Sequence, residues 1–299
     1  MKMAKNKRIT QTKEIVLLIF MILCSVLILY PIIYMVLGAT LTKSEFLEAG
    51  ILPFPKSFSF SRLKNFGKIF TADGLWQSLF VTFARIIFYA FCNIFFSTMG
   101  GYVFARVRFR GRKLVFMIYM STMMIPGIAT MVPNYIILAK FPTIGGMGMG
   151  LIDNPLVFFV TGWISVYNIF LMRQAIEGIG GDLDEAAQMD GAGRLYTVFR
   201  IYLPLTLPVV SVMMIGLFMG MWNDYTTSLI YLPSHSEWHM IGTKIIELLN
   251  DGAIVGYDTY PDYPAIYGVS VSFILPPIVV FLIFQKQIIG GLTMGAVKG

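Results

Sequence analysis

The chain has 299 residues, of which 57% are hydrophobic and only 13% are charged, and its mean hydropathy is +0.73. This composition excludes an ordinary soluble domain and indicates an integral membrane protein. The net charge of +7 does not point to nucleic-acid binding, because the basic residues stand at the ends of apolar stretches and are not interleaved with aromatic residues on a polar face.

Six apolar stretches are long enough to cross a bilayer, at residues 15–37, 77–105, 114–139, 155–176, 204–223 and 264–285. We therefore expect an all-α membrane protein with six transmembrane helices. The first stretch ends at no small-residue cleavage site, so it is expected to remain as a helix and not to be removed as a signal peptide. Cys24 and Cys92 both fall inside expected helices, so no disulfide framework is implied.

Lysine and arginine predict the orientation of these helices. With the N-terminus inside, 15 of the 23 basic residues fall in cytoplasmic segments and 7 in outer segments, and Arg85 lies within a span. Cytoplasmic loops carry the excess of positive charge in membrane proteins. Both termini, and the polar segment around Glu185, are therefore expected in the cytoplasm.

The second stretch contains Arg85, an ionisable residue at membrane depth. Such a residue is a candidate functional site, because an unpaired charge in hydrocarbon costs several kcal/mol. Two interpretations stay open: Arg85 extends to the nearby outer surface or makes a structural hydrogen bond, or it contacts substrate. Asp224 lies near the same outer end of a later stretch and is a candidate partner for Arg85.

The third and fifth stretches carry features that shape helices. Pro126 and Pro133 predict kinks in the third, which either face a pathway or serve packing. Gly216 and Gly220 in the fifth form a GxxxG spacing, which predicts a close helix contact within this chain or with another subunit. The glycine-rich segment 145–150 lacks the Lys-Ser/Thr of a phosphate-binding loop, and no GxxxxGK[ST] occurs in the chain.

Between the fourth and fifth stretches lies a polar segment with the pattern of two short helices joined by a bend. Asp182 is placed to cap the first helix, and Glu185 three residues later completes a capping-box spacing. Gly191 is expected in a left-handed conformation that ends this helix near Asp190, and a second helical pattern follows at 194–203. Helix 182–190 would be roughly 14 Å long, suited to a groove on a soluble protein. Pro204 and Pro208 mark the return to the bilayer.

This segment resembles the cytoplasmic signature loop of the membrane subunits of binding-protein-dependent ABC importers. The residues that carry the resemblance are Glu185-Ala186-Ala187, Asp190-Gly191-Ala192, Phe199, Ile201, Leu203-Pro204 and Pro208. The arginine-rich turn 106–112 is similar to the same family. The residues Trp222-Asn223-Asp224 and the Gly-Leu-Thr and Gly-Ala-Val-Lys-Gly pieces of the tail resemble its carbohydrate branch, of the maltose and multiple-sugar type. The resemblance covers about 75–299. The tail, being polar and glycine-rich, is expected to form a strand or coil.

The resemblance implies a permease subunit of an ATP-driven importer of sugars or oligosaccharides. It implies residues 1–75 as N-terminal tail, first helix and outer loop, and 76–299 as a core permease domain of five helices with a cytoplasmic coupling loop at 177–203. Implied partners are a second permease, two ATPase subunits that use ATP and Mg, an extracytoplasmic solute-binding protein and membrane lipid, but no nucleic acid. The location would be the plasma (inner) membrane of a bacterium or archaeon, crossed several times. The ATPase is expected to dock on Asp182, Leu183, Glu185, Ala186, Ala187, Asp190 and Gly191.

Two other classes of function remain as alternatives. An ion-coupled secondary carrier would show inverted repeats or buried carboxylates, and an intramembrane enzyme would place a nucleophile and a histidine at membrane depth. His235 and His239 instead lie in an expected outer loop. They do not form an HExxH motif, and no third zinc ligand is evident near them. No cofactor or metal site and no catalytic residue is expected in this chain, and no substrate-binding residue can be assigned from the sequence.

Overall fold

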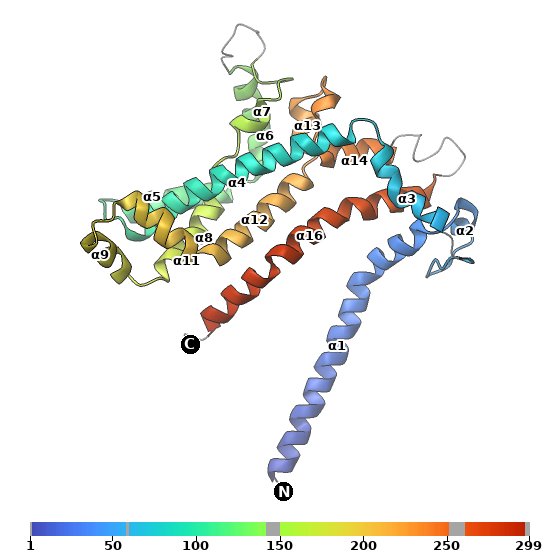
Figure 1. The fold of residues 1–299 in the computed structure, drawn as a ribbon, viewed down its shortest axis with the longest axis horizontal. Coiled ribbons are helices and arrows are strands. Elements are labelled where there is room, and N and C mark those ends of the chain that lie inside the picture. Colours follow the sequence, from blue (N-terminus) through green and yellow to red (C-terminus); the bar gives the residue numbers. More distant parts are fainter. Residues whose placement is uncertain (1, 58–59, 142–149, 251–260, 297–299) are drawn as a thin grey trace. The chain divides into compact units, whose positions relative to one another are not determined.

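The computed structural model describes the backbone of residues 2–57, 60–141, 150–250 and 261–296, and side chains from Lys13 to Gln287 within those ranges. In this part of the chain every regular element is helical, as expected (Figure 1). The chain divides into two compact units, one formed by the described parts of 1–73 and 247–275 and the other by those of 74–246 and 276–299. The glycine-rich segment 145–150 lies outside the described residues except for Gly150.

Three helices of the described chain are long and apolar enough to cross a membrane. They belong to α1 (Lys2–Ala39), α4 (Leu75–Arg106) and α16 (Tyr263–Ala296). Two bent pairs raise the number to five if each pair is one span. Helix α16 continues to Ala296, so the strand or coil expected for the tail is wrong over that range.

Proline produces the first of these bends. Helix α5 (Arg112–Ser121) continues through the 3-10 helix η3 (Thr122–Met124), and α6 (Gly127–Ala139) follows Pro126 at an angle of 96°. Pro126 has no N–H to donate and restricts the preceding residue to extended conformations, and Ile125 is indeed extended. The kink predicted at Pro126 is therefore present.

The stretch 155–176 is not one continuous helix. It forms α7 (Val157–Val160) and α8 (Val166–Glu177), with an extended Thr161, a left-handed Gly162 and Ser165 as the cap of α8 between them. Helix α8 has 12 residues, or roughly 18 Å, which is less than the ~30 Å of a bilayer core. The fourth expected span is therefore not a single helix. The expectation of six spans with both termini in the cytoplasm remains a prediction.

The unit that contains the N-terminus is organised around aromatic side chains. Tyr34, Phe46, Tyr263 and Tyr267 have ring centroids 5.4–6.4 Å apart, and Asn65 donates to the carbonyl of Ala39. The short elements of this unit are α2 (Lys43–Leu47), η1 (Phe60–Leu63), α3 (Lys64–Gly67) and η2 (Lys68–Thr71).

The second unit is built on α4, which packs against α8 and against α12 (Leu207–Trp222). A glycine allows the closest approach: a Cβ at Gly101 would lie 2.9 Å from the backbone nitrogen of Arg173. Between α8 and α12 the chain forms α9 (Asp182–Met189), α10 (Arg194–Tyr196), the π-helix η4 (Thr197–Tyr202) and α11 (Leu203–Leu205). After α12 come α13 (Thr226–Tyr231), η5 (Ser236–Trp238) and α14 (Ile241–Asn250).

Candidate docking loop and pocket

Helix α9 begins one residue earlier than expected. Its cap is Gly181, whose φ of −71° and ψ of −21° are already helical, and the N–H of Asp184 donates to the Gly181 carbonyl at 3.0 Å. A capping side chain requires an extended backbone, so Asp182 inside the first turn cannot play that part. The predicted capping box of Asp182 and Glu185 is therefore wrong. Both carboxylates stand in the first turn, where the helix dipole favours negative charge.

The end of α9 agrees with the sequence prediction. Gly191 has a φ of +78°, and the N–H of Ala192 donates back to the Ala187 carbonyl at 2.9 Å. Only glycine adopts this conformation without strain. The helical backbone resumes at Arg194, so two short helical segments joined by a bend are confirmed.

Most of the residues expected to dock a partner lie on the surface of this chain. Ala187 is buried, with 5% of its surface exposed, and packs inward. The others are exposed, namely Asp182, Leu183, Glu185, Ala186, Asp190 and Gly191. Helix α9 thus has an exposed face and three acidic residues in its first turn.

Asp184 holds α9 to the rest of the unit, and no sequence pattern pointed to it. Its Oδ1 accepts a hydrogen bond from the hydroxyl of Tyr102 in α4 at 2.9 Å, and its Oδ2 accepts one from Tyr202 in η4 at 2.6 Å. Arg106 adds an ion pair, with 3.4 Å between its Nε and Asp184 Oδ2. No periodicity links residues so far apart in sequence, and only the folded chain identifies this cluster.

Arg106 also fixes the end of α8. Its Nη2 donates to the carbonyls of Ile176 and Ile179, and its guanidinium lies over the Tyr202 ring, 5.7 Å from the centroid. The sequence pattern placed this arginine only in a basic turn that sets orientation. In the structure it joins α4, the end of α8, α9 and η4.

The π-helix η4 places its buried residues toward this cluster. Tyr202 is fully buried, and Val198 is 3% exposed. A π-helix is rare and is found often at functional sites. It is followed by a bend of 80° between 194–205 and 207–222, at Thr206 between Pro204 and Pro208, so the predicted turn at these prolines is present.

A second region of interest is the polar pair at the other end of α4. Arg85 is 6% exposed, and its Nη1 lies 2.9 Å from Asp224 Oδ2. The structure thus brings together the two residues that the sequence suggested as partners. The Arg85 guanidinium also lies 5.2 Å from the ring centroids of both Tyr89 and Phe158, and Asp224 accepts a further hydrogen bond from the Thr227 hydroxyl.

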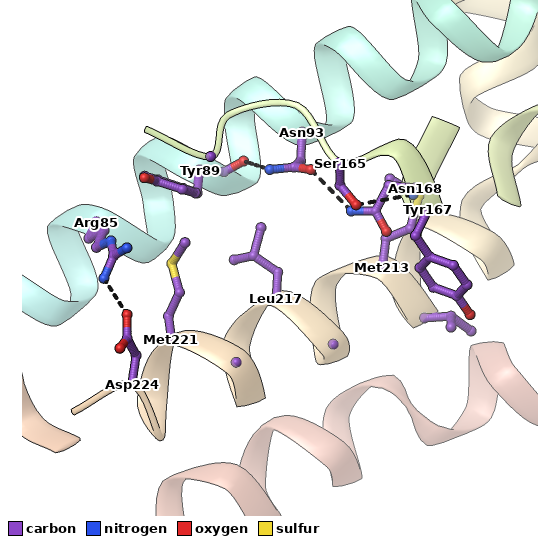
Figure 2. Close-up of a pocket in the computed structure, with 14 residues that line it drawn as sticks. Arg85, Tyr89, Asn93, Ser165, Tyr167, Asn168, Met213, Leu217, Met221 and Asp224 are labelled. Atoms are coloured by element: carbon purple, nitrogen blue, oxygen red, sulfur yellow. Dashed lines mark hydrogen bonds and ion pairs between the residues drawn. The ribbon is translucent and has the colours of Figure 1, made fainter. Parts of the chain in front are cut away.

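Arg85 and Asp224 line one end of a pocket of 450 Å³ between α4, residues 162–168 and α12 (Figure 2). At the other end, Asn168 Nδ2 donates to Asn93 Oδ1 at 3.1 Å. Gly216 and Gly220 line the pocket as well, and a Cβ at either would meet nothing within 4 Å. Within the described chain, therefore, the GxxxG face of α12 has no helix packed closely on it.

The two histidines between α13 and α14 make different contacts. His235 Nδ1 lies 2.7 Å from Glu237 Oε1, whereas the buried His239 has its Nε2 2.9 Å from the Leu232 carbonyl. Among the described residues there is no group of three or more His, Cys, Asp or Glu side chains that could hold a metal ion.

Comparison with known proteins gives consistent matches over nearly the whole chain. Residues 97–289 match the family model described as binding-protein-dependent transport system inner membrane component. The chain is 32% identical over 289 residues to an arabinooligosaccharides transport system permease protein of Bacillus subtilis (strain 168), covering 96% of each. It is 25% identical over 290 residues to a trehalose/maltose transport system permease protein of Thermococcus litoralis, covering 96% of this chain and 98% of the relative.

A solved structure has the same fold. It comes from a bacterial ABC transporter involved in the import of the acidic polysaccharide alginate, with a TM-score of 0.76 at 24% identity, over 92% of this chain and 96% of that one.

Proposed function

Because the chain belongs to the family of binding-protein-dependent transport system inner membrane components, we propose that it is the permease subunit of an ATP-driven importer of sugars or oligosaccharides. The sugar is inferred from the relatives, whose names include arabinooligosaccharide, trehalose/maltose and lactose transport permeases. The subunit crosses the plasma membrane several times with both termini in the cytoplasm and shares its pathway with a second permease.

In this proposal, ATP is hydrolysed by two separate subunits that dock on α9. The observation that carries it is the attachment of α9 by Asp184 to α4 and η4. A soluble motor can move membrane helices only through a mechanically continuous contact. Helix α9 presents an exposed face to a partner and is tied on its other face to a helix long enough to cross the membrane.

The charge of α9 indicates how the ATPase is recognised. Glu185 is exposed in the first turn and is available for a charge-assisted hydrogen bond from an arginine or lysine of the ATPase. Ala186 beside it leaves the exposed face thin enough to enter a groove. On the outer side, a solute-binding protein delivers the sugar. One solved neighbour is a transporter in complex with its pentasaccharide-bound periplasmic protein.

The proposal is tested with the tagged chain purified from its own membranes. We expect a second permease and an ATPase to co-purify, and the complex in proteoliposomes to take up an oligosaccharide only with ATP and the binding protein. Glu185→Lys is expected to reduce the recovery of the ATPase while leaving the second permease bound, because it reverses the charge at the contact. Uptake driven by a proton or sodium gradient without ATP would reject the proposal in favour of a secondary carrier.

A further inference from the structure

The pocket between α4 and α12 has one wall rich in polar side chains. This wall is formed by Arg85, Tyr89 and Asn93 of α4 and by Ser165 and Asn168 (Figure 2). Asn93 is 3% exposed and Asn168 is 9% exposed. Burying an amide side chain costs free energy unless its hydrogen bonds are made. A buried amide atom without a partner in this chain is therefore a candidate contact for a ligand.

Part of the hydrogen-bonding capacity of this wall is unused by the described residues. Asn93 Nδ2 donates to the Tyr89 carbonyl and Asn168 Nδ2 donates to Asn93 Oδ1, both at 3.1 Å. No described residue donates a hydrogen bond to Asn168 Oδ1, and the buried Nε of Arg85 has no acceptor there. The wall therefore offers the Asn168 Oδ1 acceptor to a ligand in the pocket, whereas the Arg85 Nε has almost no accessible surface.

The opposite wall is apolar and leaves room. It consists of α12 residues, among them Leu217 and Met221 (Figure 2), each of which directly follows a glycine of the pocket lining, Gly216 or Gly220. A Cβ at either glycine would meet nothing within 4 Å, so the space over this helix is open in the chain. The half-exposed ring of Tyr167 lines the pocket as well and provides a flat aromatic surface.

A polar wall facing an apolar wall matches the chemistry of a sugar ring, whose edges carry hydroxyl groups and whose faces carry C–H groups. The volume of 450 Å³ falls in the range of small-ligand sites, which is roughly 300–1,000 Å³. The charges in the pocket balance, because the guanidinium of Arg85 is paired with the carboxylate of Asp224. A ligand without net charge fits this balance better than a uronic acid does.

We infer that this pocket is a subsite for one neutral sugar residue of the transported oligosaccharide, so that this subunit itself contacts the substrate. The inference rests on the proposed function and deepens it. The competing occupant is a helix of the second permease, which would pack on Gly216 and Gly220 through their GxxxG spacing.

Ligand protection of a cysteine tests the subsite directly. In the complete complex, with Cys24 and Cys92 replaced by alanine, Tyr167→Cys is labelled with a maleimide in the presence of arabinotriose, maltotriose, lactose or trigalacturonate. We expect one of the neutral sugars to slow labelling about fivefold or more and trigalacturonate to have no effect, because the paired Arg85 and Asp224 leave no net charge in the pocket to attract a carboxylate. Gln174→Cys is the matched control, since Gln174 is exposed on the same helix and does not line the pocket. Absence of protection by every neutral sugar, or stronger protection by trigalacturonate, would overturn the inference.

A filling substitution separates the subsite from a subunit contact. Gly216→Leu has room in this chain, so the variant complex is expected to assemble and to retain stimulation of ATP hydrolysis by loaded binding protein within about twofold, while sugar uptake falls about tenfold. Met219→Trp is the size control, because Met219 is exposed on α12 and does not line the pocket. Loss of the second permease on purification of Gly216→Leu identifies a packing surface and rejects the subsite, as does unchanged uptake. If the wild-type complex transports no sugar with ATP, it is the proposed function that fails.

Discussion

The hydroxyl of Tyr202 donates a hydrogen bond of 2.6 Å to Asp184 Oδ2 and thereby joins the π-helix to the docking helix α9. Tyr102 binds the other oxygen of the same carboxylate, so one side chain connects three helical elements. A carboxylate shared in this way fixes both the position and the rotation of α9.

The first prediction concerns Asp184. Removing its carboxylate leaves the Tyr102 and Tyr202 hydroxyls without their acceptor, at a cost of about 1–3 kcal/mol. We expect Asp184→Ala to retain the ATPase on purification, because the exposed face of α9 is unchanged, but to lose stimulation of ATP hydrolysis by loaded binding protein. Asp73→Ala, which removes an exposed carboxylate elsewhere, should behave as wild type. Normal stimulation in Asp184→Ala would show that this attachment does not transmit the motion.

The second prediction uses two glycines of the docking loop. Gly191 has a φ of +78° and Gly193 a φ of −72°, and a Cβ at either would meet no atom within 4 Å. Within this chain, backbone strain therefore distinguishes valine at the two sites, and at Gly191 it amounts to about 1–3 kcal/mol. We expect Gly191→Val to reduce ATP-driven uptake severalfold with normal membrane insertion, whereas Gly193→Val keeps it. Equal uptake in the two variants would contradict a coupling role for this bend.

The third prediction concerns Arg85. Breaking a buried ion pair by removing one partner costs about 3–5 kcal/mol, because the remaining charge stays without compensation. Arg85→Leu should lower the yield of assembled complex, and the double variant with Asp224→Asn should recover part of it. Arg85→Lys keeps the charge and should be partly tolerated. The measurement is complex yield by size-exclusion chromatography, and wild-type yield and uptake in Arg85→Leu would mean that the pair is dispensable.

The fourth prediction concerns topology. With α9 in the cytoplasm, cysteines at Ser57 and Ser234 should react with an impermeant maleimide from outside, and one in the docking loop only after permeabilisation. Met189 is the suitable inner position, because it is 83% exposed, whereas Thr197 in the same loop is 3% exposed and would be protected wherever it lies. Labelling of Met189→Cys in intact cells would show that α9 lies outside the cell and that the predicted orientation is wrong.

The sequence by itself determined the class of the protein and the position of the polar loop that we propose as the docking site. Composition requires a membrane protein, and the spacing of Glu185, Gly191 and Pro204 indicates the loop, because local backbone preferences of glycine and proline act wherever the chain goes. The left-handed Gly191 and the breaks at Pro126 and Thr206 follow from these local rules.

Only the tertiary structure decided which side chains meet. The ties of Asp184 to Tyr102 and Tyr202 span 82 and 18 residues, and the pair of Arg85 with Asp224 spans 139. The apolar stretch 155–176 is long enough for one continuous helix, but a left-handed Gly162 and the Ser165 cap divide it into two helices. Apolar composition indicates that a segment lies in lipid or in the protein interior, whereas the path of its backbone depends on the elements that pack against it. The pocket has the same origin, because it exists only where α4, α8 and α12 come together.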